Sequence, residues 1–222
     1  YDGDADRIGV INEQGEPVWG DALMIIFARD VLQKNPGAAV IGEVKCSQTM
    51  YDDIAKQGGR AIMWKTGHSL IKKKMKEEGA VLAGEMSGHI FFADRYFGFD
   101  DAIYASVRLL EIMKKSGEPF GVRKLLNGIP VVINTPEIRF NCPDDKKFRV
   151  VMAMQEAFRD NPNTTIDGIR VSFPEGWALV RASNTQPALV LRFEATTPEA
   201  LKKIEEIVRG QLEKTLTHVC HN

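Results

Sequence analysis

Short apolar segments alternate with amphipathic ones through the first half of this 222-residue chain. Four segments have the length and apolar content of buried strands: residues 8–11, 40–44, 61–64 and 81–83. Four others carry apolar side chains at helical spacing: residues 21–35, 47–57, 69–78 and 101–115. Asp21 and Ser47 are the expected N-caps of the first two helices. Strands that alternate with helices form right-handed βαβ units, so this part is predicted to be an α/β domain with a mostly parallel sheet.

The pattern changes after Asn127, where Pro130 and Pro136 flank a connecting strand that we take as the boundary region between two domains. A strand, a helix, three closely spaced strands and a final helix that starts at Pro198 are expected to follow. Before the final helix, these elements are expected at residues 137–140, 144–158, 165–173, 177–181 and 189–195. Strands grouped in this way predict a smaller α+β domain, with an antiparallel sheet and helices on one face.

Charge and cysteine content argue against several classes of protein. The chain has 29 basic and 30 acidic residues, a net charge of -1, which gives no reason to expect a nucleic acid or a membrane as partner. Its three cysteines are far apart, which does not indicate a disulfide framework or a zinc site and fits a reducing cytoplasm. No apolar run reaches the ~18 residues of a membrane helix.

Asp2, Asp4 and Asp6 alternate at the start of the chain and are followed by Arg7. Carboxylates are hard ligands for Mg²⁺ or Ca²⁺, and three on one short loop repel one another unless cations neutralise them. Together with Glu13 the spacing also matches an EF-hand, but Arg7 stands where that loop requires glycine and no helix follows directly. A Mg²⁺ site beside an arginine suits a phosphate-handling centre, with a solvated acidic turn as the alternative.

Reactive side chains follow three successive strands of the α/β domain. They are Lys45; Thr66, Gly67 and His68; and Glu85, Ser87 and His89. Because ligands collect beyond the carboxyl ends of such strands, three loops of this kind predict a single cleft. Glu85 and Ser87 could hold neighbouring sugar hydroxyls, and the glycines at 84 and 88 would let the backbone bend around a ligand. Each loop alone is also compatible with an ordinary polar turn.

A second candidate site joins two strands of the α+β domain and consists of Arg181, Ser183, Asn184 and Thr185. A guanidinium, two hydroxyls, an amide and the N–H groups of a turn make a good phosphate cradle. An ordinary turn is the alternative, since such residues are common in turns. The lysines at 72–74 are expected to form a solvated helix face.

Taken together and in this order, these segments resemble the α-D-phosphohexomutase superfamily, most closely its bacterial phosphomannomutase/phosphoglucomutase branch. The resemblance implies that residues 1–13 end the second of four domains, that 14–128 form the sugar-binding third domain, and that 129–222 form the phosphate-binding fourth domain. It also implies a cytoplasmic isomerase that acts together with N-terminal domains. Such an enzyme interconverts 1-phospho and 6-phospho forms of mannose or glucose through a phosphoserine and a bisphosphorylated intermediate.

The resemblance implies a role for each candidate residue. Asp2, Asp4 and Asp6 would bind Mg²⁺, and Arg7 would lie beside the phosphate on the serine. Glu85 and Ser87 would hold the O3 and O4 hydroxyls of the sugar. The residues lining the cleft would be Lys45, Thr66, Gly67, His68 and His89, with Lys45 or His68 as general acid/base. The phosphate that is not transferred would be held by Arg181, Ser183, Asn184 and Thr185.

One feature of the family is missing from the sequence. Its phosphorylated serine lies in a Ser-His-Asn type loop of the first domain, and nothing in these 222 residues resembles that loop. We therefore expect the chain alone to be inactive. Two alternatives stay open, a non-catalytic module that binds sugar phosphates and a member of the phosphoglucosamine mutase branch.

Overall fold

The computed structural model describes residues 1–117 and 121–221, the side chains of 220 and 221 excepted. The chain divides into two compact units, Tyr1–Pro130 and Val131–Asn222, here called unit 1 and unit 2. In the described residues, no helix is both long enough and apolar enough to cross a membrane.

Unit 1 is built on a four-stranded mixed sheet. Its strands are β3 (Ala39–Glu43), β4 (Arg60–Trp64), β5 (Leu82–Gly84) and β6 (Ile90–Phe92), in the order β4-β3-β5-β6. The pairs β3/β4 and β3/β5 are parallel, whereas β6 runs antiparallel to β5. The sequence did not predict β6, because three apolar residues are too few to show a period. Nearer the N-terminus, β1 (Val10–Ile11) and β2 (Pro17–Val18) form a separate antiparallel pair.

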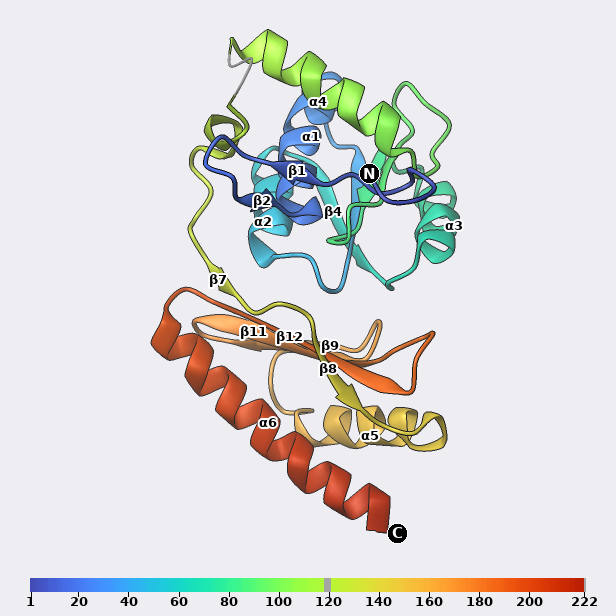
Figure 1. Ribbon diagram of the computed structural model, residues 1–222, viewed down its shortest axis with the longest axis vertical. Coiled ribbons are helices and arrows are strands. Elements are labelled where there is room, and N and C mark those ends of the chain that lie inside the picture. The colour runs from blue at the N-terminus through green and yellow to red at the C-terminus, as the bar shows by residue number, and fades with distance from the viewer. Residues whose placement is uncertain (118–120, 222) are drawn as a thin grey trace. The chain divides into compact units, whose positions relative to one another are not determined.

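Helices cover both faces of this sheet (Figure 1). The helical segments are α1 (Gly20–Lys34), α2 (Gln48–Lys56), α3 (His68–Glu78), α4 (Ala102–Ser116) and the 3₁₀ turn η1 (Arg123–Leu126). Side chains such as Val40 and Leu82 share one core with α1, α2 and α4, while Ile41 and Ala83 pack with α3 on the opposite face. Successive residues of a strand point to opposite faces, and therefore both faces of β3 are apolar and buried.

The helix starts differ in part from those predicted. Ser47 caps α2 as expected, and its hydroxyl accepts the N–H of Thr49 at 3.2 Å. The prediction for Asp21 was wrong, because α1 begins at Gly20 with Trp19 at the N-cap position. Asp21 lies in the first turn, and its carboxylate accepts the backbone N–H of Ser47 at 2.9 Å. Its contribution is thus to tie the start of α1 to the loop that follows β3.

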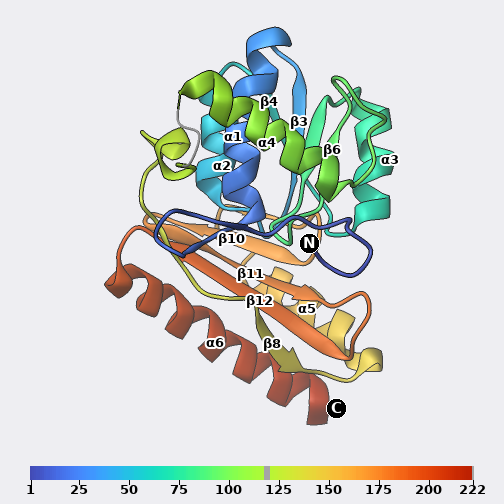
Figure 2. The same cartoon turned by 45° about the horizontal axis from the view of Figure 1, so that its top comes forward.

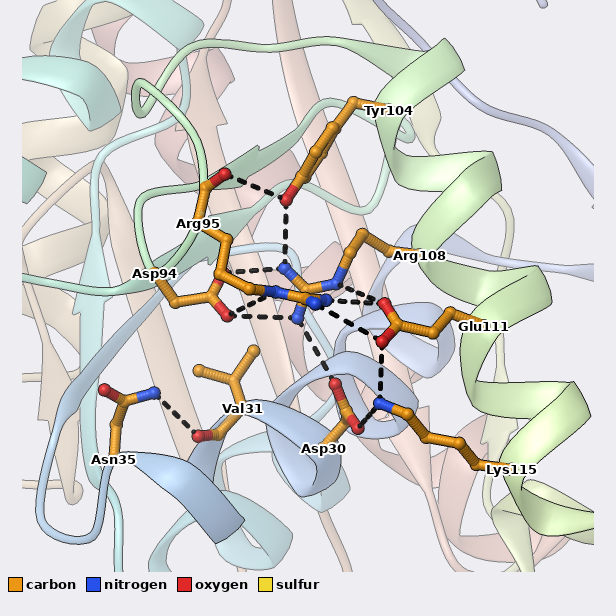
Figure 3. A network of polar contacts seen from close by, with 9 residues as sticks. All are labelled: Asp30, Val31, Asn35, Asp94, Arg95, Tyr104, Arg108, Glu111 and Lys115. Carbon is orange, nitrogen blue, oxygen red and sulfur yellow. Dashed lines mark hydrogen bonds and ion pairs between the residues drawn. The ribbon is translucent and has the colours of Figure 1, made fainter.

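A buried arginine connects α4 to α1 and to the segment after β6 (Figure 3). The side chain of Arg108 is 3% exposed and donates to both oxygens of Asp94, at 2.7 and 3.1 Å, and to Asp30 at 3.2 Å. Its guanidinium lies 4.3 Å from the ring centre of Phe92. These contacts fix the position of α4, whose N-terminal end adjoins the candidate site.

Unit 2 is a six-stranded antiparallel sheet with two helices on one face (Figure 2). Its elements are β7 (Ile133–Asn134), β8 (Ile138–Asn141), α5 (Asp144–Ala157), β9 (Asn163–Thr164), β10 (Ile169–Phe173), β11 (Gly176–Ala182), β12 (Ala188–Ala195) and α6 (Pro198–His221). Met154 of α5 and Val208 of α6 pack in one core with Val180 and Phe193 of the sheet. Unit 2 therefore has an α+β layout, and every strand pair in it is antiparallel.

Candidate functional site

A single buried carboxylate connects the loops that follow β3, β4 and β5. Glu43, the last residue of β3, is fully buried. Its Oε2 accepts hydrogen bonds from the backbone N–H of Lys45 at 2.8 Å and from the hydroxyl of Thr66 at 2.9 Å, and its Oε1 accepts the N–H of Met86 at 3.3 Å. The Nζ atom of Lys45 lies 3.9 Å from Oε1. The structure thus brings the three reactive loops together at one edge of the sheet.

Glu85 is a second buried carboxylate at this edge. Its Oε1 accepts the N–H of Gly67 at 2.7 Å, and the hydroxyl of Ser87 lies 3.5 Å from its Oε2. Burial and the charge of Glu43 raise the pKa of the Glu85 carboxyl, although the N–H of Gly67 acts in the opposite direction. Gly67 has a φ of +131°, which favours glycine and lets its N–H point at Glu85. Because Oε1 already accepts the N–H of Gly67, Oε2 of Glu85 is the oxygen suited to accept a hydrogen bond from a ligand hydroxyl.

The acidic loop gathers its three carboxylates. One oxygen each of Asp2, Asp4 and Asp6 lies within 4.8 Å of the others. Ala5 between them has a φ of +59°, a strained conformation for a residue with a side chain and one that is found preferentially at functional sites. Arg7 donates its backbone N–H to Asp2 at 3.2 Å and pairs with the same carboxylate through Nε. Three converging carboxylates held in a strained turn fit a hard divalent cation.

The pKa values of two carboxylates in this loop are shifted in opposite directions. The hydrogen bond from the Arg7 side chain lowers the pKa of Asp2. Burial raises the pKa of Asp6; the charges of Asp4 and Asp2 act in the same direction, whereas that of His89 lowers it. A bound cation would stabilise the ionised form of all three aspartates.

Backbone contacts hold the acidic loop against residues 84–89. The N–H of Ile8 donates to the carbonyl of Gly88 at 3.1 Å, and Arg7 forms an antiparallel bridge with His89. Gly88 has a φ of +97°, and a Cβ atom there would lie 2.4 Å from the Ile8 carbonyl oxygen. Glycine is therefore required at 88 by this close approach of two backbones, and not by a bend around a ligand as the sequence suggested.

Asp100, in the segment before α4, is a contact point for three cationic or polar side chains. Its Oδ2 lies 3.0 Å from the Nδ1 atoms of both His68 and His89, and its Oδ1 accepts a hydrogen bond from Nζ of Lys72 at 2.8 Å. Despite burial, the hydrogen bonds from Lys72, His89 and His68 lower the pKa of Asp100 to about 2. One ligand atom each of Asp6, His68, His89 and Asp100 also lies within 4.8 Å of the others. The histidines thus lie next to the acidic loop.

The three lysines in the middle of α3, Lys72 to Lys74, do not form one solvated face. Lys73 fits that prediction, with a side chain that is 78% exposed. Lys72 instead pairs with Asp100, and Lys74 is only 16% exposed and lies 4.4 Å from the ring centre of Trp64. The prediction was wrong for these two because each finds a partner from another part of the chain.

The second candidate site lies at the turn from β11 to β12 in unit 2. Arg181 is 5% exposed, and its Nε donates to Asp167 at 3.0 Å. Its Nη2 is buried, with no hydrogen-bond partner among the described residues. A buried, unpaired guanidinium N–H is costly unless a ligand satisfies it, which supports an anion site here. The hydroxyl of Ser183 accepts the N–H groups of Thr185 and Gln186 at 3.4 and 3.2 Å, while Asn184 and Thr185 are exposed.

A buried lysine braces this turn. Lys147 of α5 donates to the carbonyls of Ser183 and Gln186, at 2.7 and 3.1 Å, and pairs with Asp144 at 2.7 Å. Sequence reasoning missed Lys147, although a signal existed. Lys147 is a charged residue at a position that shares the core-facing side of α5 with Val150, three residues further on. Glu43 has a similar signal, since it is a carboxylate within the predicted buried strand 40–44, whereas no such signal marks Asp100 in its irregular segment.

Replacing Glu43 with glutamine is expected to lower the free energy of unfolding of unit 1 by about 2 kcal/mol. The amide has only one acceptor oxygen, and its NH₂ group would face an N–H or a hydroxyl that now donates to a carboxylate. Hydrogen exchange in urea, followed by mass spectrometry, measures unit 1 separately from unit 2. Glu77→Gln on the exposed side of α3 is the control, and a Glu43→Gln chain as stable as that control would contradict this role.

Comparisons with known proteins cover both units. Residues 19–127 match the family model "Phosphoglucomutase/phosphomannomutase, alpha/beta/alpha domain III", and residues 137–211 match "Phosphoglucomutase/phosphomannomutase, C-terminal domain". A phosphomannomutase/phosphoglucomutase of Pseudomonas syringae pv. tomato is 52% identical over 216 residues. A phosphoglucomutase of Neisseria meningitidis serogroup A is 48% identical over 217 residues. Each alignment covers 96% of this chain and 46% of the relative, so the chain spans about half the length of these proteins.

A solved structure shows the same fold. The crystal structure of a phosphoglucomutase/phosphomannomutase family protein from Burkholderia thailandensis superposes with a TM-score of 0.88 at 43% identity. The superposition covers 97% of this chain and 46% of that one. Because the two family models together match most of the chain, it belongs to the phosphoglucomutase/phosphomannomutase family of the α-D-phosphohexomutase superfamily.

Proposed function

We propose that this chain is the C-terminal part of a Mg²⁺-dependent, cytoplasmic enzyme that interconverts 1-phospho and 6-phospho forms of mannose and glucose. The observation that carries the proposal is the joining of the acidic loop to the sheet edge, through Ile8 and Gly88 and through the bridge between Arg7 and His89. It brings hard-metal ligands, an arginine and a histidine together, groups that can neutralise charge and move a proton during phosphoryl transfer.

The reaction proposed is the transfer of a phosphoryl group from a serine to a sugar hydroxyl, with a bisphosphorylated sugar as intermediate. Asp2, Asp4 and Asp6 would hold Mg²⁺, which when bound neutralises charge on the phosphoryl oxygens. Arg7 would also neutralise negative charge on the phosphoryl oxygens. As the new P–O bond forms, the sugar hydroxyl loses its proton to a general base, and the electron pair of the broken P–O bond stays on the serine oxygen. His68, His89 and Lys45 are the candidates for the base.

Substrate binding in this proposal uses both units. Glu85 and Ser87 would bind the O3 and O4 hydroxyls, and Oε2 of Glu85 is the acceptor suited to this. In this assignment no residue would contact O2, so glucose and mannose phosphates would both be accepted. The phosphate that is not transferred would be held in unit 2 by Arg181, Ser183, Asn184 and Thr185. The unpaired Nη2 of Arg181 supports this assignment.

The 222-residue chain alone is expected to show no turnover of glucose 1-phosphate, since nothing in it resembles the serine loop of the family. The whole protein, primed with glucose 1,6-bisphosphate, is expected to form glucose 6-phosphate, which a coupled dehydrogenase assay detects. Turnover by the chain alone would contradict the proposal. Binding of glucose 6-phosphate by the whole protein without turnover would instead favour the non-catalytic module. Exclusive turnover of glucosamine phosphates would assign the phosphoglucosamine mutase branch.

A further inference from the structure

Asp100 holds two histidines with one of its oxygen atoms. The Nδ1 atoms of His68 and His89 each lie 3.0 Å from Oδ2, whereas Lys72 occupies Oδ1 at 2.8 Å. The side chains of Asp100 and His89 are only 7% and 14% exposed, whereas that of His68 is 53% exposed. Asp100 thereby connects α3, which carries His68 and Lys72, with the residue that precedes β6, His89.

The chemistry of a carboxylate determines where the histidine protons lie. An ionised carboxylate accepts hydrogen bonds but has no proton to donate. The ammonium group of Lys72, 2.8 Å from Oδ1, stabilises the ionised form of Asp100 without reference to either imidazole. Each Nδ1 atom must therefore carry the proton of its hydrogen bond. A neutral imidazole that is protonated on Nδ1 has an unprotonated Nε2, which is then a proton acceptor.

Ring contacts fix the two imidazoles relative to the acidic loop. The rings of His68 and His89 meet edge to face, with centres 5.5 Å apart, and the His89 ring stacks on Phe91 at 6.4 Å. Nδ1 of His89 is 3.9 Å from a carboxylate oxygen of Asp6. The two imidazoles thus lie beside the acidic loop. In each ring Nδ1 contacts Asp100, and Nε2 lies on the other side of the ring.

We propose that Asp100 is a positioning residue that holds His68 and His89 in the Nδ1-protonated tautomer, so that both rings present Nε2 as a proton acceptor. The use of either Nε2 toward a sugar hydroxyl rests on the proposed function. The tautomer itself does not depend on the proposed function, because it follows from contacts within unit 1. The tautomer and its use in catalysis can therefore be tested separately.

Ring ¹⁵N NMR of the 222-residue chain at about pH 8 tests the tautomers directly. The chain has four histidines, and His68→Gln and His89→Gln variants assign the two signals in question. Both rings are expected to show a protonated Nδ1 and an unprotonated Nε2. His218, exposed on α6, is an internal reference that is expected to favour Nε2–H, as a free imidazole does. A protonated Nε2 on either His68 or His89 in the neutral state would overturn the proposal.

Asp100→Asn is the decisive variant, because an amide has a single acceptor oxygen and donates from its nitrogen. At least one of the two rings is expected to change to the Nε2–H form. Asp52→Asn, at an exposed position of α2, makes the same charge change and is expected to leave both rings unaltered. A folded Asp100→Asn chain with both tautomers unchanged would overturn the proposal, and its backbone amide spectrum establishes that it is folded.

Kinetics of the whole protein test the use of these tautomers. Asp100→Asn is expected to lower kcat by about 10²-fold with little change in KM, since misplaced acid/base groups affect proton transfer more than binding. If the wild-type tautomers are as expected but the wild-type whole protein shows no turnover, the proposed function is wrong and the role of Asp100 stands. An unchanged kcat in the variant of an active enzyme would overturn the catalytic use of the histidines.

Discussion

Replacing Asp4 with asparagine in the whole protein is expected to lower kcat for glucose 1-phosphate by about 10³-fold. Asp4 is exposed, and its oxygen is one of the three that converge in the acidic loop. Loss of its charge would weaken Mg²⁺ binding and leave phosphoryl oxygens less neutralised during transfer. Initial rates measured over a range of Mg²⁺ concentrations would show whether added metal restores part of the activity.

Glu13→Gln is the matched control for Asp4→Asn. Glu13 is exposed and stands at the last ligand position of the EF-hand that the sequence could also suggest. The structure places a strand pair, β1 and β2, directly after the acidic loop in place of a helix. Glu13→Gln is therefore expected to keep the activity and Mg²⁺ dependence of the wild type. Equal losses in both variants would contradict a site made of Asp2, Asp4 and Asp6 alone.

Replacing Arg108 with methionine is expected to lower the free energy of unfolding of unit 1 by about 3–5 kcal/mol. The reason lies in the network of Figure 3, where the Asp94 side chain is 4% exposed and Asp30 is 11% exposed. Methionine fills a similar volume but removes the nearest cation from both carboxylates, which keep only the more distant Arg95 (3.7 Å from Asp94) and Lys115 (3.5 Å from Asp30). Native-state hydrogen exchange of α1 and α4 measures the effect, and peptides from unit 2 provide an internal reference.

Arg95→Met is the control within the same network. Arg95 pairs with Glu111, but its side chain is 41% exposed, so its loss is expected to cost about 0–1 kcal/mol. A double variant, Arg108→Met with Asp94→Asn, removes one of the uncompensated charges and is expected to be more stable than Arg108→Met alone. Similar losses for Arg95→Met and Arg108→Met would show that burial of the network does not determine its contribution.

Local sequence signals account for most of the fold. Apolar periodicity and caps predicted β3, β4, β5, α2, α4, α5 and α6 to within a few residues, since these signals arise within one or two turns or one strand. The two errors, at β6 and at Asp21, arise where such local signals are absent or misleading. Three residues of β6 show no period, and Asp21 looks like a cap in sequence but bonds to Ser47, 26 residues away. The boundary between the units at Pro130 follows a change of pattern that is visible in the sequence.

The sequence allowed the reactive residues of the candidate site to be predicted, but not all of the residues that position them through hydrogen bonds. Lys45, Thr66, Glu85 and their neighbours follow strands, and parallel strands end at a common edge, so their convergence could be inferred from topology. Lys147 could have been found as a charge on a core-facing helix position. Asp100 could not, because nothing in an irregular segment indicates which side chains will reach it.

Short stretches of this chain determine where most of its strands and helices begin and end, because periodicity, capping and backbone conformation depend on near neighbours. They also contain the reactive residues and the glycine at 67. The protonation and orientation of the reactive groups depend on residues far apart in sequence. Glu43 becomes a fully buried acceptor for two other loops, and Asp100 an ionised acceptor for two histidines, only when folding removes them from water and brings their donors within hydrogen-bonding distance.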